Sequence, residues 1–247
     1  MLVLERVKMS IQGAEQRKFV RVYLLAGVAT SPQFFNTGCE TVGKLCEQSG
    51  WRSTVEVLFP YGDNTRGVIS QVSRAAGDLS KRFTLFQHGG RHAANSIRKS
   101  YVGEPLILIG HSGGGAAAYQ AIRILHKEQK LGDFRIVQLG SPKVPICPDF
   151  RNRVYYAYVV DEQGRRKDPV AKLGTWGGWS AGRFMLPRWD RYKYAPGHIE
   201  ELRLLGGHAD YFRHGHPYVD KNQVSNLDKT LGRVWKWLQL SLFCRSG

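Results

Sequence analysis

The sequence predicts an α/β protein whose mostly parallel central sheet is covered by helices on both faces. Strand and helix patterns alternate along the chain, and this alternation is typical of parallel sheets. The chain has 247 residues, of which 42% are hydrophobic, and this is enough for one large domain with a substantial core. The sequence contains no internal repeat, low-complexity block or linker. We therefore expect residues 1–247 to form a single domain.

The predicted strands are short runs rich in Val, Ile, Leu and Tyr, and several of them end where Gly or a turn sequence begins. Continuous apolar runs of this kind are typical of strands that are buried on both faces. The run that stops at Gly110 is followed at once by an Ala-rich helical pattern, so we expect a sharp strand-to-helix turn there. In chain order the predicted strands are 19–27, 54–59, 105–109, 134–140, 154–160 and 199–205.

Helical patterns fill most of the intervals between these strands. The pattern after Gly110 carries apolar residues at helical spacing, and the last one is amphipathic and contains two Trp residues. Two stretches lack a clear period: residues 1–18 are polar and charged, and residues 171–198 are rich in Gly, Trp, Tyr and Arg. The predicted helices lie near 35–49, 65–81, 90–101, 116–130 and 226–242.

The composition also suggests a cellular compartment. No apolar run approaches the roughly 20 residues that span a bilayer, and the first eight residues carry charges within their only apolar patch, which makes a poor secretory signal. The four Cys residues show neither a C-x-x-C pair nor a zinc spacing, so they indicate structural thiols in a reducing environment. We therefore expect a cytoplasmic protein that uses no metal or other cofactor.

The net charge of +16 is the most unusual bulk property of the chain. Such a charge favours anionic partners, which include nucleic acids, phospholipid surfaces and acidic substrates. The basic residues are spread along the sequence, apart from 164–167, and no recognition helix or RNA-binding motif accompanies them. A nucleic-acid partner is therefore not expected, whereas solubility and peripheral contact with an anionic membrane surface both remain open.

One short motif points to chemistry. Gly110-His111-Ser112-Gly113-Gly114 fits G-x-S-x-G and lies between a predicted strand and a predicted helix. This is the context of the nucleophile elbow of α/β-hydrolases, where a sharp turn exposes the Ser hydroxyl to a base and only Gly fits on either side. Neither G-x-G-x-x-G nor a G-K-[ST] ending is present, which counts against a phosphate-binding loop. Ser112 is therefore the candidate nucleophile.

A Ser nucleophile needs a base, and the base needs a carboxylate that orients it. In this fold the three residues follow in the order Ser, Asp or Glu, His. Asp161 stands at the end of the strand 154–160, and Asp168 stands in Asp-Pro-Val, so the position alone leaves both open. Among the late histidines, His208 directly follows the last predicted strand, which favours it as the base. The other candidates for the base are His198, His214 and His216.

Around Ser112 the sequence resembles the class 3, or fungal-type, lipases. Their elbow is similar to residues 110–116, with one additional Gly here, and their Gly-Ser-Pro strand end is similar to residues 140–144. Their acid lies in an Asp-Pro-Val context, which points to Asp168, and their His-x-x-Tyr motif points to His208. The resemblance covers roughly residues 105–212. It implies an α/β-hydrolase fold and a serine carboxylic ester hydrolase that acts on lipid or small-molecule esters through Ser112, Asp168 and His208.

Two features of those lipases are missing from this sequence. The His-Gly pair before the oxyanion loop is replaced by Ala26-Gly27, so we expect the oxyanion donors to be the N–H of Gly113 and that of Val28 or Ala29. No lid helix is visible early in the chain, which favours esterase chemistry over true interfacial lipase activity. The aromatic stretch 171–198 could be a cap over an acyl pocket or ordinary core packing.

Several other functions remain compatible with the sequence. A thioesterase or a phospholipase would use the same triad. A non-catalytic module of the same fold could bind an anionic membrane or nucleic acid through its positive charge. A metal site is a further alternative, although its spacing matches no standard zinc motif. Its candidate ligands are His208, Asp210, His214 and His216.

Overall fold

A computed structural model describes residues 18–28, 30–62, 79–129, 131–181 and 186–243. Its centre is a six-stranded sheet with the strand order β2-β1-β3-β4-β5-β8, in which every neighbouring pair is parallel. The expectation of an α/β fold with a mostly parallel central sheet is confirmed. The strands are β1 (Phe19–Leu25), β2 (Arg52–Leu58), β3 (Leu106–His111), β4 (Phe134–Leu139), β5 (Val154–Val160) and β8 (His198–Arg203).

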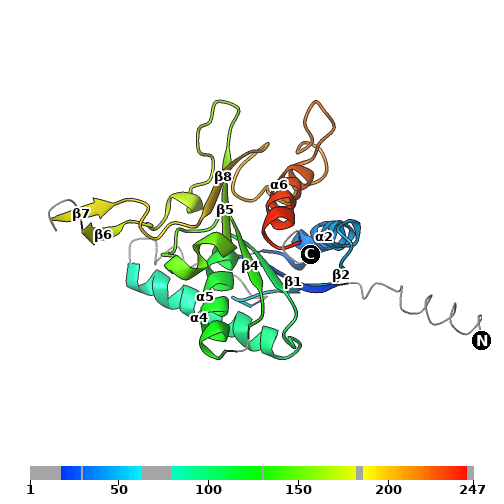
Figure 1. The fold of residues 1–247 in the computed structure, drawn as a ribbon. Helices are drawn as coiled ribbons and strands as arrows, with labels where there is room; N and C mark the ends of the chain where they lie inside the picture. Colours follow the sequence, from blue (N-terminus) through cyan, green and yellow to red (C-terminus); the bar gives the residue numbers. More distant parts are fainter. Residues whose placement is uncertain (1–17, 29, 63–78, 130, 182–185, 244–247) are drawn as a thin grey trace, which may run out of the picture.

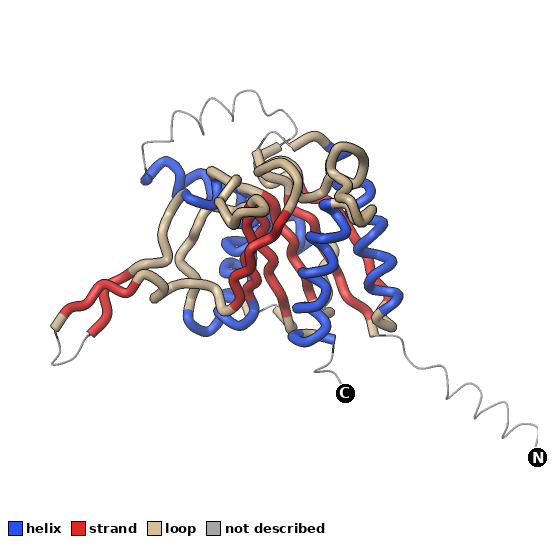
Figure 2. The backbone as a smooth tube through the Cα atoms, turned by 90° about the horizontal axis from the view of Figure 1, so that it is seen from above, coloured by secondary structure: helices blue, strands red, loops and turns tan. Residues whose placement is uncertain are grey.

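Helices cover both faces of this sheet, as Figures 1 and 2 show. Two helices pack against each other on one face, and the other two lie together on the opposite face. The first pair is α4 (Leu79–Arg98) and α5 (Gly113–Lys127), and the second pair is α2 (Asn36–Gln48) and α6 (Asn226–Ser241). Short 3₁₀ turns are η1 (Pro32–Phe35), η3 (Pro148–Arg153) and η4 (Val170–Lys172).

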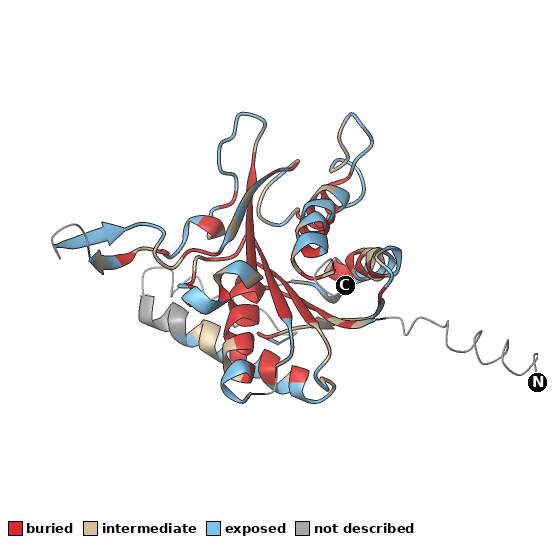
Figure 3. Cartoon of the chain, viewed as in Figure 1, coloured by how far each residue is buried: buried red, intermediate tan, exposed pale blue. Residues whose placement is uncertain are grey.

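The sheet separates two apolar cores. Because side chains alternate along a strand, β5 turns Tyr155 and Val159 toward α2 and α6, whereas Tyr156 and Tyr158 point to the other face. The central strands β3, β4 and β5 are buried along their whole length (Figure 3), which agrees with the continuous apolar runs in the sequence, whereas the edge strands β2 and β8 are partly exposed. The buried sheet therefore provides a rigid base for the loops that follow its strands.

The boundaries of the two helices predicted before the elbow differ in the structure. The sequence predicts helices near 65–81 and 90–101, but α4 runs without a break from residue 79 to residue 98, while residues 63–78 lie outside the described residues. Gly89 and Gly90 lie inside this continuous helix. The close packing of α4 on α5 requires a glycine there, because a Cβ at Gly90 would collide with the side chain of Gln120 on α5. Packing of α4 on α5 offsets the weak helix propensity of Gly.

The stretch 171–198, which has no clear period in the sequence, contains a two-stranded antiparallel hairpin. Its strands β6 (Gly178–Ala181) and β7 (Pro187–Asp190) pair only with each other and place Trp179 opposite Trp189. The hairpin extends away from the central sheet (Figures 1 and 2). In the part of the chain that the structure describes, no helix is long and apolar enough to cross a bilayer.

Candidate active site

The carboxyl ends of β3, β5 and β8 meet at one edge of the sheet, because the strands are parallel. Ser112 follows β3, Asp168 lies in the loop after β5, and His208 lies in the loop after β8. The structure brings these three predicted residues together. His208 Nε2 lies 3.0 Å from Ser112 Oγ, and His208 Nδ1 lies 2.9 Å from Asp168 Oδ1.

Ser112 occupies a tight turn between β3 and α5. Its backbone has φ 56° and ψ −132°, which a non-Gly residue rarely adopts. A hydrogen bond from Ser112 N to Leu139 O (2.9 Å) ties the turn to β4. The glycines of the motif are required by close approach, because a Cβ at Gly114 would collide with the carbonyl of Leu25, and one at Gly110 would collide with Gly114. These contacts explain why G-x-S-x-G occurs at this point.

Asp168 is completely buried beneath the imidazole of His208. Its Oδ1 accepts hydrogen bonds from the backbone N–H groups of Val170 (2.9 Å) and Ala171 (3.1 Å) as well as from His208. Because an ionised carboxylate only accepts, the proton of the neutral imidazole lies on Nδ1, and Nε2 is free to accept from the Ser112 hydroxyl. This tautomer is the one that general-base chemistry at the hydroxyl needs.

The environment of Asp168 keeps it ionised. Burial alone would raise the pKa of this carboxyl group, but the hydrogen bonds and charge of His208 and the hydroxyl of Tyr211 outweigh that effect and hold the pKa below its ordinary value. A negative charge is therefore maintained at a fully buried position. Such a charge strengthens the electrostatic support of an imidazolium at His208.

Tyr211 is a second partner of the carboxylate that the sequence did not assign a role. Its hydroxyl donates to Asp168 Oδ2 (2.7 Å) and accepts from the backbone N–H of Val159 (2.9 Å). Burial and the neighbouring Asp168 raise the pKa of Tyr211 well above its ordinary value, so the phenol stays protonated and can donate. The signal for it in the sequence is that Tyr211 is the Tyr of the His-x-x-Tyr motif.

His111, the variable residue of the G-x-S-x-G motif, packs under the imidazole of His208. The two rings are stacked with centroids 5.0 Å apart, and His111 Nε2 lies 2.7 Å from the backbone oxygen of His208. Burial, together with His208, lowers the pKa of His111 to about 4. The ring is therefore neutral near pH 7 and donates from Nε2 to the carbonyl. No local sequence signal predicts this contact, because it joins residues that are 97 positions apart.

Of the predicted oxyanion donors, Gly113 and Val28 belong to the described residues. Gly113 is the first residue of α5, where backbone N–H groups have no partner within the helix, and the hydroxyl of Tyr61 donates to its carbonyl oxygen at 2.9 Å. Gly27 lies against the nucleophile, since a Cβ there would be 2.6 Å from Ser112 Cβ. Val28 follows directly and is half-buried, whereas Ala29 lies outside the described residues.

The remaining acid and base candidates lie in other surroundings. Asp161 caps its own turn, where it pairs with Arg165 and accepts the backbone N–H of Gln163. His198 stacks on Tyr155 at the start of β8.

The histidines of the proposed metal site do not gather around an ion site. His214 and His216 are exposed in the following loop, and Asp210 accepts from the backbone N–H of Gly207. Within the described ranges, no three His, Cys, Asp or Glu side chains lie close enough to hold a metal ion.

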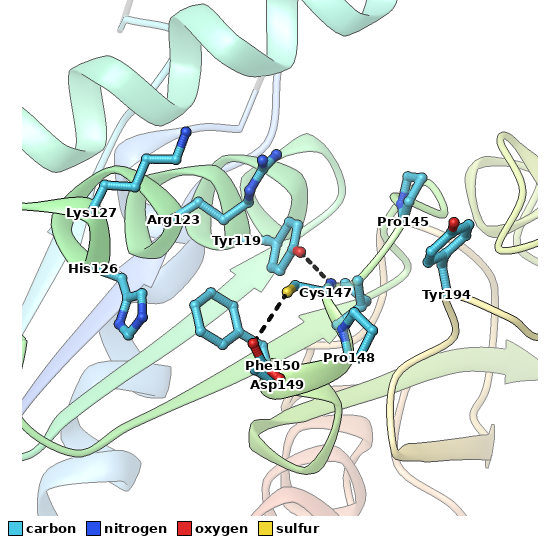
Figure 4. Close-up of a pocket in the computed structure, with 11 residues that line it drawn as sticks. Tyr119, Arg123, His126, Lys127, Pro145, Cys147, Pro148, Asp149, Phe150 and Tyr194 are labelled. Atoms are coloured by element: carbon cyan, nitrogen blue, oxygen red, sulfur yellow. Dashed lines mark hydrogen bonds between the residues drawn. The ribbon is translucent and has the colours of Figure 1, made fainter.

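A cavity of about 370 Å³ lies along the flank of α5, and none of the three triad residues lines it (Figure 4). The hydroxyl of Tyr119 accepts the backbone N–H of Cys147 (2.7 Å) at its wall, while Arg123 and Lys127 project from the helix. This cavity is therefore separate from the candidate active site.

Comparison with known proteins finds a similarity in backbone structure but none in sequence. The sequence matches no family model and no curated protein. Among solved structures, the RedJ thioesterase of the prodiginine pathway of Streptomyces coelicolor is 12% identical with a TM-score of 0.47, over 89% of this chain and 90% of that one. The NocB thioesterase domain of the nocardicin cluster is 14% identical with a TM-score of 0.44, over 87% and 92%. The lin2722 product of Listeria innocua is 11% identical with a TM-score of 0.47, over 90% and 94%.

Proposed function

We propose that the chain is a serine hydrolase that cleaves carboxylic esters through an acyl-enzyme. The observation that carries this proposal is the hydrogen-bonded series from Ser112 Oγ through His208 to the buried Asp168, with Ser112 held at a positive φ. Distances of 2.9 and 3.0 Å are within the range that proton transfer needs. A serine, an imidazole and a carboxylate in this order form the constellation that activates a hydroxyl for acyl transfer.

In the first half of the proposed reaction, Ser112 Oγ attacks the ester carbonyl carbon, and its proton passes to His208 Nε2. Asp168 keeps the proton on Nδ1 and stabilises the imidazolium that forms. The carbonyl electron pair moves to the oxygen, which becomes an oxyanion. When this intermediate collapses, the bond to the alcohol breaks, and His208 returns the proton to the leaving oxygen. The acyl group remains bound to Ser112.

In the second half, water replaces the alcohol. His208 takes a proton from the water as its oxygen attacks the acyl carbon, and the second tetrahedral intermediate releases the carboxylic acid and restores the Ser112 hydroxyl. We propose that the oxyanion of both intermediates accepts hydrogen bonds from the N–H groups of Gly113 and Val28. A donor of this type contributes on the order of 3 kcal/mol to the transition state.

The proposal is tested at Ser112. A fluorophosphonate probe should label the wild-type protein and should not label Ser112→Ala, and p-nitrophenyl ester turnover should disappear in the same variant. The variant should unfold at the wild-type temperature, because the hydroxyl contributes little to packing. Labelling or turnover that persists in Ser112→Ala would exclude this residue as the nucleophile. An absence of labelling in the wild type would favour the non-catalytic binding module.

The same triad would hydrolyse thioesters or phospholipid acyl esters, since the attack at the carbonyl carbon is the same. A panel of oxygen esters and thioesters with matched acyl chains, assayed on the purified protein, separates these substrate classes by kcat/KM. A preference for p-nitrophenyl oxygen esters is expected under the esterase proposal.

A further inference from the structure

A second cavity of about 370 Å³ lies beside β5 at the base of the β6–β7 hairpin. Three cationic side chains line it, namely Lys143, Arg166 and Arg191. Among the described residues that form its wall, none is acidic. The first two come from the loops after β4 and β5, and the third follows β7. The fold therefore brings three positive charges from distant parts of the chain to one cavity.

These charges are not neutralised by carboxylates within the cavity. No ion pair joins Lys143 or Arg191 to an acidic residue in the described part of the chain. Burial lowers the pKa of Lys143, and the neighbouring Arg166 and Arg191 lower it further, which reflects like charges in one place. Arg166 donates to the hydroxyl of Tyr158 at 3.0 Å, and that hydroxyl donates in turn to Glu201 (2.6 Å), which does not line the cavity. An anion in this cavity would relieve the repulsion among the three groups.

Aromatic rings form the rest of the wall. The Lys143 ammonium lies 5.3 Å from the centre of the Trp176 ring, and the Arg166 guanidinium lies 4.3 Å from that of Tyr158. Trp189 and Tyr192 also line the cavity and are 47% and 58% exposed, so they form an open rim that an organic group can contact. The cavity thus offers a positively charged end and an aromatic end in a volume that suits a small ligand.

We propose that this cavity binds the phosphate group of a phosphate ester, whose organic part contacts the aromatic rim. A phosphate ester carries one or two negative charges and several acceptor oxygens, which match the point charge of a Lys and the planar donors of two Arg side chains. The phosphate ester is either a lipid headgroup or a soluble molecule. Binding here does not depend on the reaction proposed at Ser112, so either proposal can fail without the other.

The test measures binding to the full-length protein in two arms. Phenyl phosphate, a soluble aromatic phosphate ester, is titrated by calorimetry and by Trp fluorescence. Diether phosphatidic acid, which has no acyl ester to hydrolyse, is presented in phosphatidylcholine vesicles and compared with phosphatidylcholine alone by co-sedimentation. We expect saturable binding in at least one arm. Binding of phenyl phosphate identifies a soluble ligand as the source, and binding only of the phosphatidic acid vesicles identifies a lipid headgroup.

Variants separate the cavity from the general positive charge. Lys143→Gln and Arg191→Gln should each weaken binding at least tenfold, whereas Lys236→Gln, which removes the same charge from the exposed side of α6, should leave it unchanged. Lys143→Gln should fold normally, because it removes a partly buried charge that its neighbours disfavour, and Arg191→Gln changes an exposed residue. An absence of binding in both arms, or an equal loss in Lys236→Gln, would overturn the proposal.

Discussion

His208 is held in the candidate triad by contacts on two sides. Asp168 accepts a hydrogen bond from the Nδ1–H group of His208. On the other side, the neutral ring of His111 stacks against the His208 ring and donates a hydrogen bond to the backbone oxygen of His208. Tyr211 in turn holds Asp168 through the second carboxylate oxygen. Each of these contacts restricts the orientation of the imidazole, and a well-oriented base is what the proton transfer from Ser112 requires.

Tyr211→Phe tests this support. The change removes the hydrogen bond to Asp168 and leaves the buried N–H of Val159 without an acceptor, so we expect a loss of about 1–3 kcal/mol in the free energy of unfolding. It should also lower kcat for ester turnover with little change in KM, because Tyr211 acts through the carboxylate. Tyr155→Phe is the matched control, because it removes another buried Tyr hydroxyl, which lies on β5 and is hydrogen-bonded to Glu200. An unchanged kcat in Tyr211→Phe would show that Asp168 does not need this contact.

The buried His111 should make the stability of the protein depend on pH. Its pKa is about 4 in the folded protein and about 6.5 in an unfolded chain. Between these values the unfolded state binds a proton that the folded state does not, so stability falls as the pH is lowered from 7 toward 4. From pH 7 to pH 5 this group should cost about 2 kcal/mol. Urea unfolding of the wild type and of His111→Gln at pH 7 and pH 5 tests this prediction. An equal decrease in the free energy of unfolding of the two proteins would contradict it.

At the scale of elements, the contact between the first turn of α5 and the end of β1 determines where Ser112 lies. Gly114 packs directly against the carbonyl of Leu25, and Gly27 packs against Ser112 itself. Gly115 also has a physical reason, because a Cβ there would be 2.7 Å from Ser141 Oγ in the Gly-Ser-Pro loop. The glycine-rich turn is therefore closely packed against both neighbouring strand ends.

A pair of Gly→Ala changes tests this packing. Gly114→Ala should destabilise the protein strongly, because its methyl group would collide with backbone atoms of Leu25 and push α5 away from the sheet. Gly232→Ala on α6 meets no atom within 4 Å and should stabilise the protein by about 1 kcal/mol, as expected for Gly in a helix interior. Denaturant unfolding curves measure both changes. Equal effects at the two positions would mean that close approach is not what requires Gly114.

At the scale of the whole molecule, the sheet lies between the two apolar cores and contributes side chains to both of them. Strands such as β5 carry side chains of both cores on alternate residues, so neither core can lose its packing without disturbing the strands of the other. The β6–β7 hairpin is different, since it pairs only with itself and exposes Trp179. Stability should therefore reside in the sheet and in the helices α2, α4, α5 and α6, which cover it.

We accordingly predict a single unfolding transition, as expected if the chain is one domain. Urea curves followed by far-UV circular dichroism, which reports secondary structure, and by Trp fluorescence, which reports packing, should coincide. Trp51 and Trp235 report on the α2–α6 side, and Trp176 reports on the opposite side. Two separated transitions would mean that the cores unfold independently.

Local sequence was sufficient for the six strands of the central sheet, for α2, α5 and α6, and for the turn at Ser112, but it did not predict the β6–β7 hairpin. Hydrophobic periodicity depends on neighbouring residues, and the elbow motif is contained in five of them. The order of Ser112, Asp168 and His208 also follows from the chain, once the resemblance points to Asp168. The continuous α4 could not be predicted, because the packing of Gly90 against α5 offsets the low helix propensity of Gly there.

Tertiary structure decided which residues from distant segments of the chain contact one another. Asp161 and Asp168 have similar positions relative to β5 in the sequence, but only Asp168 is buried against His208. The contacts of His111 and Tyr211 with the triad, and the meeting of Lys143, Arg166 and Arg191, join residues from different strand ends. Local propensity contains no information on such pairs. The contacts at the triad, and the approach of Lys143 to Arg166, form because parallel strands place the loops that follow them at the same edge of the sheet. The β6–β7 hairpin adds Arg191 to them.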